Sequence, residues 1–531
     1  MAEMSAALTA RDLGANHAVT VVACLGNVLF GQWLRKTRPA AACIELVGGI
    51  EQGGTTAKTG IGAWISAIPI LACERPLGAF LSGNAILLAR QTGAPFGVCH
   101  GLLIINAHCF LAGVGVMRIV VLGSGLIGVA SAWFLSEAGH EVTVVDRQPG
   151  PARETSFANG GQISTSHAEP WANPGTPKKI LKWLGREDAP LLWRFSPELA
   201  RWEWGLRFLR ECTAARTRAN IQAILALALD SRMRLKSLRQ DLGLEYDCLE
   251  RGILHFYTDE AEFAHAIPQA ALMREFGCER VVMTAAECLA IEPALQHAAV
   301  PIVGGTYTAS DESGDAYRFA VLLADRCAER GVCFRFDTTV ESLDVVGGQV
   351  RGIVSSSGER MPAEVVVVAM GSYSPRFLSR VGIRIPVYPA KGYSITVPLA
   401  DHSLAPIVSL TDDGAKLVYS RFGNRLRVAG TAEFSGYDVS LNPVRLQPMI
   451  RRVRDIFPRL NFSDDSIDTW SGLRPATPNN VPLIGSTPLR GLFVNTGHGT
   501  LGWTLAVGSG QLLADILASR STAIDPAPYQ I

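Results

Sequence analysis

Residues 118–147 read RIVVLGSGLIGVASAWFLSEAGHEVTVVDR and decide the fold of the chain. The apolar run at 119–122 predicts a buried parallel strand. Gly123, Gly125 and Gly128 follow with GxGxxG spacing, which allows a tight turn, close approach of a pyrophosphate and close packing of helix on strand. The free N–H groups and partial positive charge at the start of a helix favour phosphate there. The stretch therefore predicts a strand–turn–helix unit that binds a dinucleotide.

The second strand of this unit is predicted at 141–145 and ends at Asp146, 23 residues after Gly123. A carboxylate at this place can accept a hydrogen bond from a ribose hydroxyl. The glycine loop does not distinguish NAD from FAD, so later segments have to decide between them. Residues 154–164, ETSFANGGQIS, are small and polar and suit close approach to a cofactor better than core packing.

Later segments predict that the chain returns to the first sheet. Residues 197–242 show helical periodicity. Apolar runs at 349–355 and 364–370, the second ending at Gly371, predict strands, and we expect the second run to rejoin the first sheet. A strand at 492–495 leads into Gly497, Gly499 and Gly502 before an apolar helix, which is again a backbone-rich pocket at a helix start. Cofactor contacts at both ends of this span predict one interrupted domain closed around a ligand larger than a mononucleotide.

The composition is typical of a globular protein, with 531 residues, 48% hydrophobic, 18% charged and a net charge of +1. This near-neutral balance argues against a nucleic-acid binder. The cysteine count of eleven is odd and includes no CxxC pair, so we interpret the cysteines as thiols in a reducing compartment. The cluster Cys99-His100 with His108-Cys109 lacks the ligand spacing of a zinc site, and we predict no metal.

The first 116 residues differ from the rest in charge, with seven Lys or Arg and five Asp or Glu against 42 and 43 in the remainder. Uncharged runs at 13–34 and 91–117 are long enough to cross a bilayer, but their polar residues weaken insertion. Glu3 and Asp12 argue against a signal peptide. Three interpretations of this segment remain: a membrane anchor, a targeting segment, or sequence upstream of a start codon at Met117. We favour the last, because Met117 comes one residue before the first predicted strand.

From residue 117 to the end, the chain resembles the small subunits of D-amino acid dehydrogenases, within the wider family of D-amino acid oxidase, glycine oxidase and sarcosine oxidase. Besides the glycine loop and residues 154–164, the resemblance rests on three further motifs, VYPAKGYSIT at 387–396, SGLRPATPNNVPLIG at 471–485 and NTGHGTLGWT at 495–504. It implies an α/β fold, α+β overall, in which a Rossmann-type FAD-binding domain is interleaved with a substrate domain of antiparallel sheet and helices. We expect the FAD domain at 117–200, 310–386 and 479–531, and the substrate domain at 201–309 and 387–478.

The resemblance implies that FAD is the cofactor, and no cysteine follows Cys333 to hold it covalently in the C-terminal part. The segment 119–133 is expected to carry the ADP half, and the later glycine-containing segments to surround the rest. The predicted cofactor-binding residues are Ile119, Val120, Val121, Leu122, Gly123, Ser124, Gly125, Leu126, Ile127, Gly128, Val129, Ala130, Ser131, Ala132, Trp133, Asp146, Arg147, Thr155, Ser156, Asn159, Gly160, Gly161, Gly371, Gly497, His498, Gly499, Thr500 and Gly502.

The resemblance also places Arg474 where related oxidases hold the substrate carboxylate, and the planar two-pronged guanidinium suits that role. Tyr393 is a second candidate, on the active-site face, and Lys391 is interpreted as a solvated charge beside a turn glycine. The implied reaction is oxidation of a D-amino acid by hydride transfer from Cα to flavin N5. No acid/base pair is needed if the amine loses its proton on binding, and the sequence shows no His/Asp constellation.

The implied partners are a D-amino acid and a quinone or other respiratory acceptor, with the protein peripheral on the cytoplasmic side of the inner membrane, or cytoplasmic. Two alternatives stay open. One is an oxidase of glycine, sarcosine or a similar amine that uses oxygen. The other is a membrane-tethered flavoprotein without catalytic activity.

Overall fold

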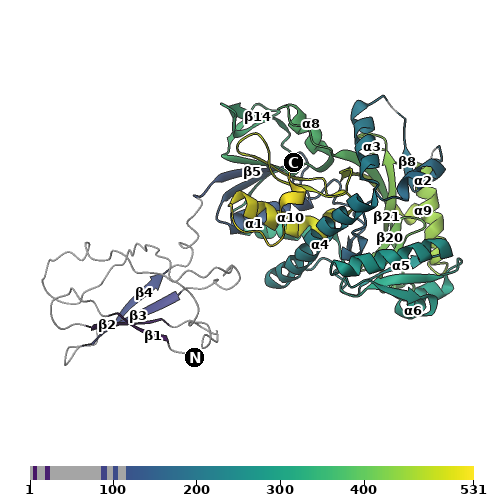
Figure 1. Cartoon of the computed structure of the whole chain (residues 1–531), viewed down its shortest axis with the longest axis horizontal. Coiled ribbons are helices and arrows are strands. Elements are labelled where there is room, and N and C mark those ends of the chain that lie inside the picture. Colours follow the sequence, from purple (N-terminus) through teal and green to yellow (C-terminus); the bar gives the residue numbers. More distant parts are fainter. Residues whose placement is uncertain are drawn as a thin grey trace. The chain divides into compact units, whose positions relative to one another are not determined.

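The computed structural model describes residues 115–183, 185–195 and 197–531, together with four strands that precede them (Figure 1). The chain divides into two compact units, residues 1–115 and 116–531. In the first unit an antiparallel sheet has the order β1-β2-β3-β4, with strands β1 (Met4–Leu8), β2 (Ala18–Ala23), β3 (Ala85–Thr92) and β4 (His100–Ile105). Apart from residues of β2, β3 and β4 and residues 115–117, the two uncharged runs lie outside the described residues, as do the side chains of the Cys/His cluster.

A six-stranded sheet forms the dinucleotide fold of the second unit, in the order β13-β6-β5-β17-β24-β23. All neighbours are parallel except β23 with β24. Its pairing of β17 with β5 confirms that the run at 364–370 returns to the first sheet. The strands are β5 (Arg118–Leu122), β6 (Glu141–Val145), β13 (Cys333–Arg335), β17 (Val365–Val368), β23 (Leu483–Ser486) and β24 (Leu492–Thr496).

The strand expected at 349–355 belongs to a separate small antiparallel sheet, in the order β14-β15-β16. Gly347 and Gly348 both have positive φ, of 59° and 73°, which is the backbone that a two-residue hairpin turn needs. This turn pairs the strand with its neighbour in sequence. The strands are β14 (Val340–Val346), β15 (Gln349–Ser355) and β16 (Arg360–Pro362).

A nine-stranded sheet is the largest of the second unit, in the order β10-β11-β9-β19-β20-β21-β18-β22 with β8 beside β21. It is antiparallel except for β9 with β19 and β21 with β8. Alternating apolar residues predicted strands between residues 387 and 478, where β18 to β22 lie. The ranges of all the strands in this sheet follow. They are β8 (Leu191–Trp193), β9 (Ile253–Tyr257), β10 (Val281–Thr284), β11 (Gly304–Thr308), β18 (Tyr388–Pro398), β19 (Ser409–Asp412), β20 (Leu417–Phe422), β21 (Arg425–Phe434) and β22 (Asp468–Ala476).

Three helices lie side by side on the dinucleotide fold, α1 (Leu126–Glu137), α4 (Ala214–Leu242) and α10 (Gly502–Leu517) (Figure 1). α10 has glycines where it meets its neighbours. A Cβ at Gly508 would lie 2.8 Å from Ser231, and a Cβ at Gly510 would lie 2.7 Å from the Ala130 carbonyl oxygen. Only glycine permits such close helix packing.

The helix expected at 197–242 is two helices, α3 (Leu199–Glu211) and α4, and Thr213 accepts a hydrogen bond from the Arg216 amide as the N-cap of α4. The other helices are α2 (Thr176–Trp183), α5 (Glu260–Glu275), α6 (Ala285–Ile291), α7 (Ala316–Glu329), α8 (Ser374–Ser379) and α9 (Pro443–Ile456). Short strands β7 (Gln162–Ile163) and β12 (Glu312–Ser313) pair with each other. Residues 116–531 form one compact unit, so the division into two domains stays a prediction.

Candidate functional site

A cavity of about 900 Å³ is lined both by the dinucleotide fold and by the nine-stranded sheet. Its wall includes Leu122 and Val145, the last residues of β5 and β6. Gly430 of β21 and Arg474 of β22 belong to the same wall. Ligands of open parallel sheets bind at the carboxyl ends of the strands, and the volume lies within the usual range of cofactor sites, about 300–1,000 Å³.

The three glycines of the loop differ in what surrounds them. Gly123 has φ of +103°, and a Cβ there would lie 2.7 Å from the Ala369 carbonyl oxygen. A Cβ at Gly128 would lie 1.8 Å from the Gly123 carbonyl oxygen. In contrast, a Cβ at Gly125 would have only Ser156 Oγ nearby, at 3.7 Å, and Gly125 lines the cavity. The first and third glycines therefore build the turn, while the second leaves room for a ligand.

The start of α1 faces the cavity with backbone donors. Gly125 is the N-cap and has no capping side chain. The Leu126 amide donates to Ser156 Oγ at 3.2 Å, and the next N–H groups of the first turn remain available to a phosphate. The Asp146 carboxylate accepts hydrogen bonds from the Ser124 amide at 2.6 Å and the Gln148 amide at 2.8 Å. It also accepts from Ser124 Oγ at 2.8 Å, which leaves one of its about four acceptor sites for a ribose hydroxyl.

His498 presents an unpartnered buried nitrogen at the same cavity. Ser509 Oγ donates to the Leu505 carbonyl, so it must accept the hydrogen bond from His498 Nε2 at 2.9 Å. Nδ1 is then an acceptor, and it has no partner among the described residues. Burial lowers the pKa of His498 to about 3, which keeps the ring neutral. A bound cofactor with a hydrogen-bond donor would satisfy this atom, so the residues present fit a dinucleotide such as FAD.

The structure brings together part of the predicted cofactor set. The following predicted residues line the cavity: Leu122, Gly123, Gly125, Leu126, Ile127, Asp146, Arg147, Thr155, Ser156, Asn159, Gly160, Gly371, His498, Gly499, Thr500 and Gly502. The other predicted residues are not part of the cavity wall. They lie in β5, α1 and the turn between them, before β7 and after β24: Ile119, Val120, Val121, Ser124, Gly128, Val129, Ala130, Ser131, Ala132, Trp133, Gly161 and Gly497. Cofactor contacts of individual residues stay a prediction.

Arg474 projects into the cavity from β22. Its guanidinium donates to the carbonyl oxygens of Thr431, at 2.6 Å, and Gly430, at 3.1 Å. Among the described residues no carboxylate pairs with it, and burial alone lowers its pKa to about 10. The group therefore stays charged at neutral pH. A buried cation without a counter-charge is costly unless an anion binds, so the cavity is suited to a carboxylate.

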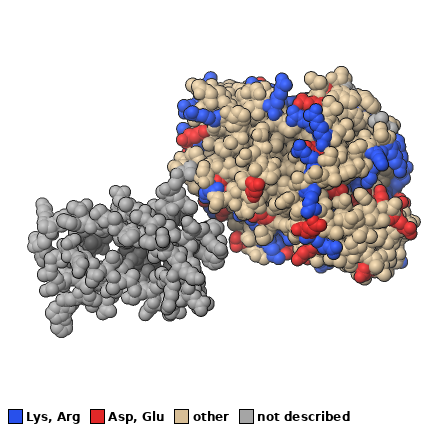
Figure 2. Space-filling view, in the orientation of Figure 1, with Lys and Arg blue, Asp and Glu red and all other residues tan. Residues whose placement is uncertain are grey.

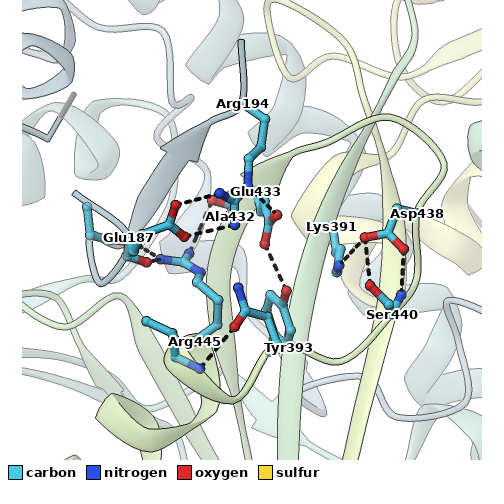
Figure 3. A network of polar contacts seen from close by, with 12 residues as sticks. Glu187, Arg194, Lys391, Tyr393, Ala432, Glu433, Asp438, Ser440 and Arg445 are labelled. Atoms are coloured by element: carbon cyan, nitrogen blue, oxygen red, sulfur yellow. Dashed lines mark hydrogen bonds and ion pairs between the residues drawn. The ribbon is translucent and has the colours of Figure 1, made fainter. Parts of the chain in front are cut away.

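Tyr393 also belongs to the cavity wall, but its hydroxyl is engaged elsewhere (Figure 3). It donates to Glu433 Oε2 at 2.8 Å, and Glu433 forms an ion pair with Arg194 at 3.1 Å. Burial, and secondly this hydrogen bond, raise the pKa of Tyr393 above its usual value. In β18 and β22, Ala390 pairs with Arg474, so Tyr393, three residues along from Ala390, points to the opposite face of the sheet. The structure does not bring the Tyr393 hydroxyl together with Arg474.

Lys391 is not a solvated charge beside a turn glycine, contrary to expectation. Its side chain is buried and forms an ion pair with Asp438 at 2.8 Å (Figure 3). The following Gly392 lies in the middle of β18. The pattern KGY was misread as a turn, because Gly392 pairs with Gly472 in the regular ladder between β18 and β22.

A polar chain that the sequence did not reveal lines another part of the cavity. His255 Nδ1 lies 3.0 Å from Asp413 Oδ2, and His255 Nε2 lies 3.2 Å from Ser166 Oγ. Burial opposes ionisation of Asp413, but Lys416 and His255 outweigh it and hold its pKa well below the usual value. Burial lowers the pKa of His255. A His/Asp constellation is therefore present, contrary to expectation from the sequence.

His167 stacks on His255 with ring centroids 5.6 Å apart, and burial, then the neighbouring ring, lowers the pKa of His167 to about 3. Burial raises the pKa of Glu169, which also lines the cavity. These side chains come from three separate segments, so no local motif contains them. The sequence gives one signal for this group of side chains: His255 is the polar residue in the otherwise apolar strand β9, ILHFY.

Comparisons with known proteins agree with this geometry. The DAO family, described as FAD dependent oxidoreductase, matches residues 118–516. A D-amino acid dehydrogenase of Dechloromonas aromatica (strain RCB) is 58% identical over 76% of this chain and 97% of its own length. One of Paramagnetospirillum magneticum (strain ATCC 700264 / AMB-1) is 52% identical over 77% and 96%.

Among solved structures, glycine oxidase from Geobacillus kaustophilus is similar with a TM-score of 0.62 and 23% identity, over 78% of this chain and 98% of that one. L-proline dehydrogenase from P. horikoshii is similar with a TM-score of 0.62 and 17% identity, over 78% and 96%. At such identities the likeness shows the fold alone. Together with the relatives, it confirms the α/β fold and the resemblance expected from the motifs. The chain belongs to the DAO family, and it is an FAD-dependent oxidoreductase.

Proposed function

We propose that this enzyme oxidises D-amino acids such as D-alanine to 2-oxo acids and ammonia, and passes the electrons to a quinone-type acceptor. The names of the relatives, D-amino acid dehydrogenase at 58% and 52% identity, support the substrate class. The structural observation that carries the proposal is Arg474, a half-buried guanidinium in the cavity wall with no acidic partner among the described residues.

Arg474 would bind the substrate carboxylate. Its hydrogen bonds to Thr431 and Gly430 fix the guanidinium plane, because two carbonyl oxygens hold two different nitrogens. A planar donor pair then matches the two carboxylate oxygens, and the buried setting strengthens the attraction. The anchored end would orient the Cα–H and the amine within the cavity.

The glycine loop, the start of α1 and Asp146 would hold the ADP half of FAD, and residues around His498 would hold the rest. Bound FAD supplies the acceptor for the hydride from Cα. The amine loses a proton and the imino acid forms, which water hydrolyses to the 2-oxo acid and ammonia. The two electrons, with two protons, reduce a quinone to a quinol.

The acceptor, and peripheral attachment to the cytoplasmic side of the inner membrane, belong to this proposal. None of the helices within the described residues has the length and apolar character to cross a bilayer. A quinone is lipophilic, so an enzyme that reduces it needs access to the membrane surface.

Turnover of candidate substrates tests the proposal. With a dye as acceptor, D-alanine should be oxidised faster than glycine or sarcosine, and quinone should be reduced without stoichiometric hydrogen peroxide. Preference for sarcosine or glycine with peroxide formation would instead identify an amine oxidase. A flavoprotein that no amino acid reduces would be the non-catalytic alternative.

A further inference from the structure

Helix α3 is apolar on two opposite faces. Its inner face packs Trp204 and Phe208 into a cluster with Phe434. Its outer face exposes an apolar stripe with helical spacing, which we call the outer stripe: Leu199, Trp202, Leu206 and Leu209, with exposed fractions of 79%, 42%, 61% and 50%. A surface helix of a soluble domain normally has a polar outer face, so contiguous apolar exposure marks an interaction surface.

The outer stripe continues onto neighbouring elements. Phe195, 68% exposed, lies with its ring 6.2 Å from that of Trp202. Helix α2 packs on the same inner cluster through Ile180 and exposes Leu181 by 74%. Exposed apolar side chains therefore occur on both α2 and α3, which lie on either side of β8 in Figure 1.

The charge on α2 has one sign, whereas α3 carries both signs, with Glu203 and Arg207 paired on its surface. α2 reads TPKKILKW and contains three lysines but no acidic residue. Lys178, Lys179 and Lys182 form no ion pair with any described residue. Figure 2 shows basic side chains gathered over the edge of the molecule where α2 and α9 lie. An apolar face flanked by unpaired lysines is the pattern of a helix that lies on an anionic bilayer.

This surface adjoins the cavity. Lys179 and Trp183 of α2 belong to the cavity wall, as do Pro190 and Leu191 just beyond it. A molecule that docks on the outer face of α2 would therefore be one helix away from the proposed flavin site.

We propose that α2 and the outer stripe of α3 dock on an anionic lipid bilayer, so that a membrane-dissolved acceptor enters the cavity beside α2. This inference rests on the proposed function, which includes the acceptor and peripheral attachment, and it adds the surface that docks. Apolar side chains of the stripe would enter the boundary between headgroups and acyl chains, and the lysines would pair with lipid phosphates.

A second copy of the chain fits this surface less well. A two-fold interface brings the same patch of both copies together. The unpaired lysines of α2 would then face a second set of lysines, and like charges at an interface oppose association. An anionic bilayer has the opposite charge.

Co-sedimentation of the full-chain holoenzyme with vesicles tests the docking. The vesicles contain phosphatidylcholine with phosphatidylglycerol, and matched vesicles contain phosphatidylcholine alone. We expect binding to the anionic vesicles that weakens as salt is raised. The double variant Leu206→Ser, Leu209→Ser should lower the partition coefficient by about tenfold or more, because lost apolar burial weakens interfacial binding. Lys178→Ala with Lys182→Ala should lower binding only to the anionic vesicles.

The control is Met233→Ser with Val346→Ser, two residues that are 63% and 60% exposed outside α2 and α3. It should bind vesicles like the unaltered protein. All three variants should keep dye-linked turnover of D-alanine. This assay measures catalysis without a membrane, so it separates failure of membrane docking from failure of the proposed oxidation of D-amino acids.

Vesicle binding that the Leu206/Leu209 variant retains would overturn the docking proposal. So would a protein that does not bind anionic vesicles. If the unaltered protein is a dimer by gel filtration and this variant a monomer, without vesicle binding by either, the surface is an interface between copies.

Discussion

The guanidinium of Arg474 lies directly against Gly392 of the neighbouring strand, where an added Cβ would be 2.2 Å from Nη1. The contact comes from the register of β18 and β22, in which Ala390 pairs with Arg474 and Gly392 with Gly472. A second close contact adjoins it, because a Cβ at Gly472 would lie 1.9 Å from the ring of Trp470. Of these two paired glycines, Gly392 makes room for Arg474, and Gly472 makes room for the ring of Trp470.

Gly392→Ala should displace the Arg474 guanidinium and raise the KM for D-alanine about tenfold or more. A displacement of about one ångström is enough to weaken the hydrogen bonds between the guanidinium and the substrate carboxylate. Steady-state kinetics with a dye acceptor measures this. Ser394→Ala is the matched control, since Ser394 is buried two residues along the same strand and its Oγ has no hydrogen-bond partner among the described residues. Equal kinetics for the two variants would show that Gly392 does not serve Arg474.

Arg474→Ala should lower kcat/KM for D-alanine by at least about tenfold, because a charged anchor is worth more than about 1.4 kcal/mol. Arg474→Lys keeps the charge but loses the two-pronged geometry, so it should recover only part of the loss. Flavin content should stay unchanged in both variants. Unchanged kinetics in Arg474→Ala would show that Arg474 does not bind the substrate.

Gly125→Ala and Gly128→Ala should fail in different ways. A Cβ at Gly128 meets the Gly123 carbonyl oxygen at 1.8 Å, so Gly128→Ala should destabilise the fold by about 1–3 kcal/mol even without FAD. A Cβ at Gly125 meets nothing closer than 3.7 Å, so Gly125→Ala should fold normally and bind FAD about tenfold or more weakly. Urea unfolding of the apoprotein and FAD titration separate the effects. Normal FAD affinity in Gly125→Ala would contradict phosphate binding at this loop.

Stability should fall with acid because of His498. Its pKa is lowered to about 3 by burial, whereas an unfolded histidine titrates near about 6.5. At a pH between these two pKa values, this histidine binds a proton in the unfolded chain but not in the folded chain. The stabilisation is therefore complete above about pH 6.5 and is lost as the pH falls, by about 1.4 kcal/mol per pH unit.

His498→Gln should reduce the slope of the free energy of unfolding against pH by this amount. His402→Gln, at an exposed histidine, should leave the slope unchanged. Urea titrations of apoprotein between pH 4 and 6.5 give the slopes, and equal slopes for both variants would show that His498 titrates normally.

The dinucleotide unit and the return of β17 could be predicted because each is encoded by a local apolar run or glycine spacing. The Arg474–Gly392 contact could not, since it depends on strand register rather than on either residue's neighbours. His255 and Asp413 lie 158 residues apart and meet only through the parallel pairing of β9 and β19. The misread KGY pattern had the same origin, because a glycine in a strand and a glycine in a turn look alike in sequence.

The visible spectrum of the anaerobic holoenzyme tests the central claim most directly, because it reports cofactor, substrate and reaction together. The account predicts yellow protein whose flavin absorbance is bleached by D-alanine and not by L-alanine, and is bleached far more slowly in Arg474→Ala. Flavin that D-alanine leaves oxidised, or that glycine and sarcosine reduce while D-alanine does not, would contradict it.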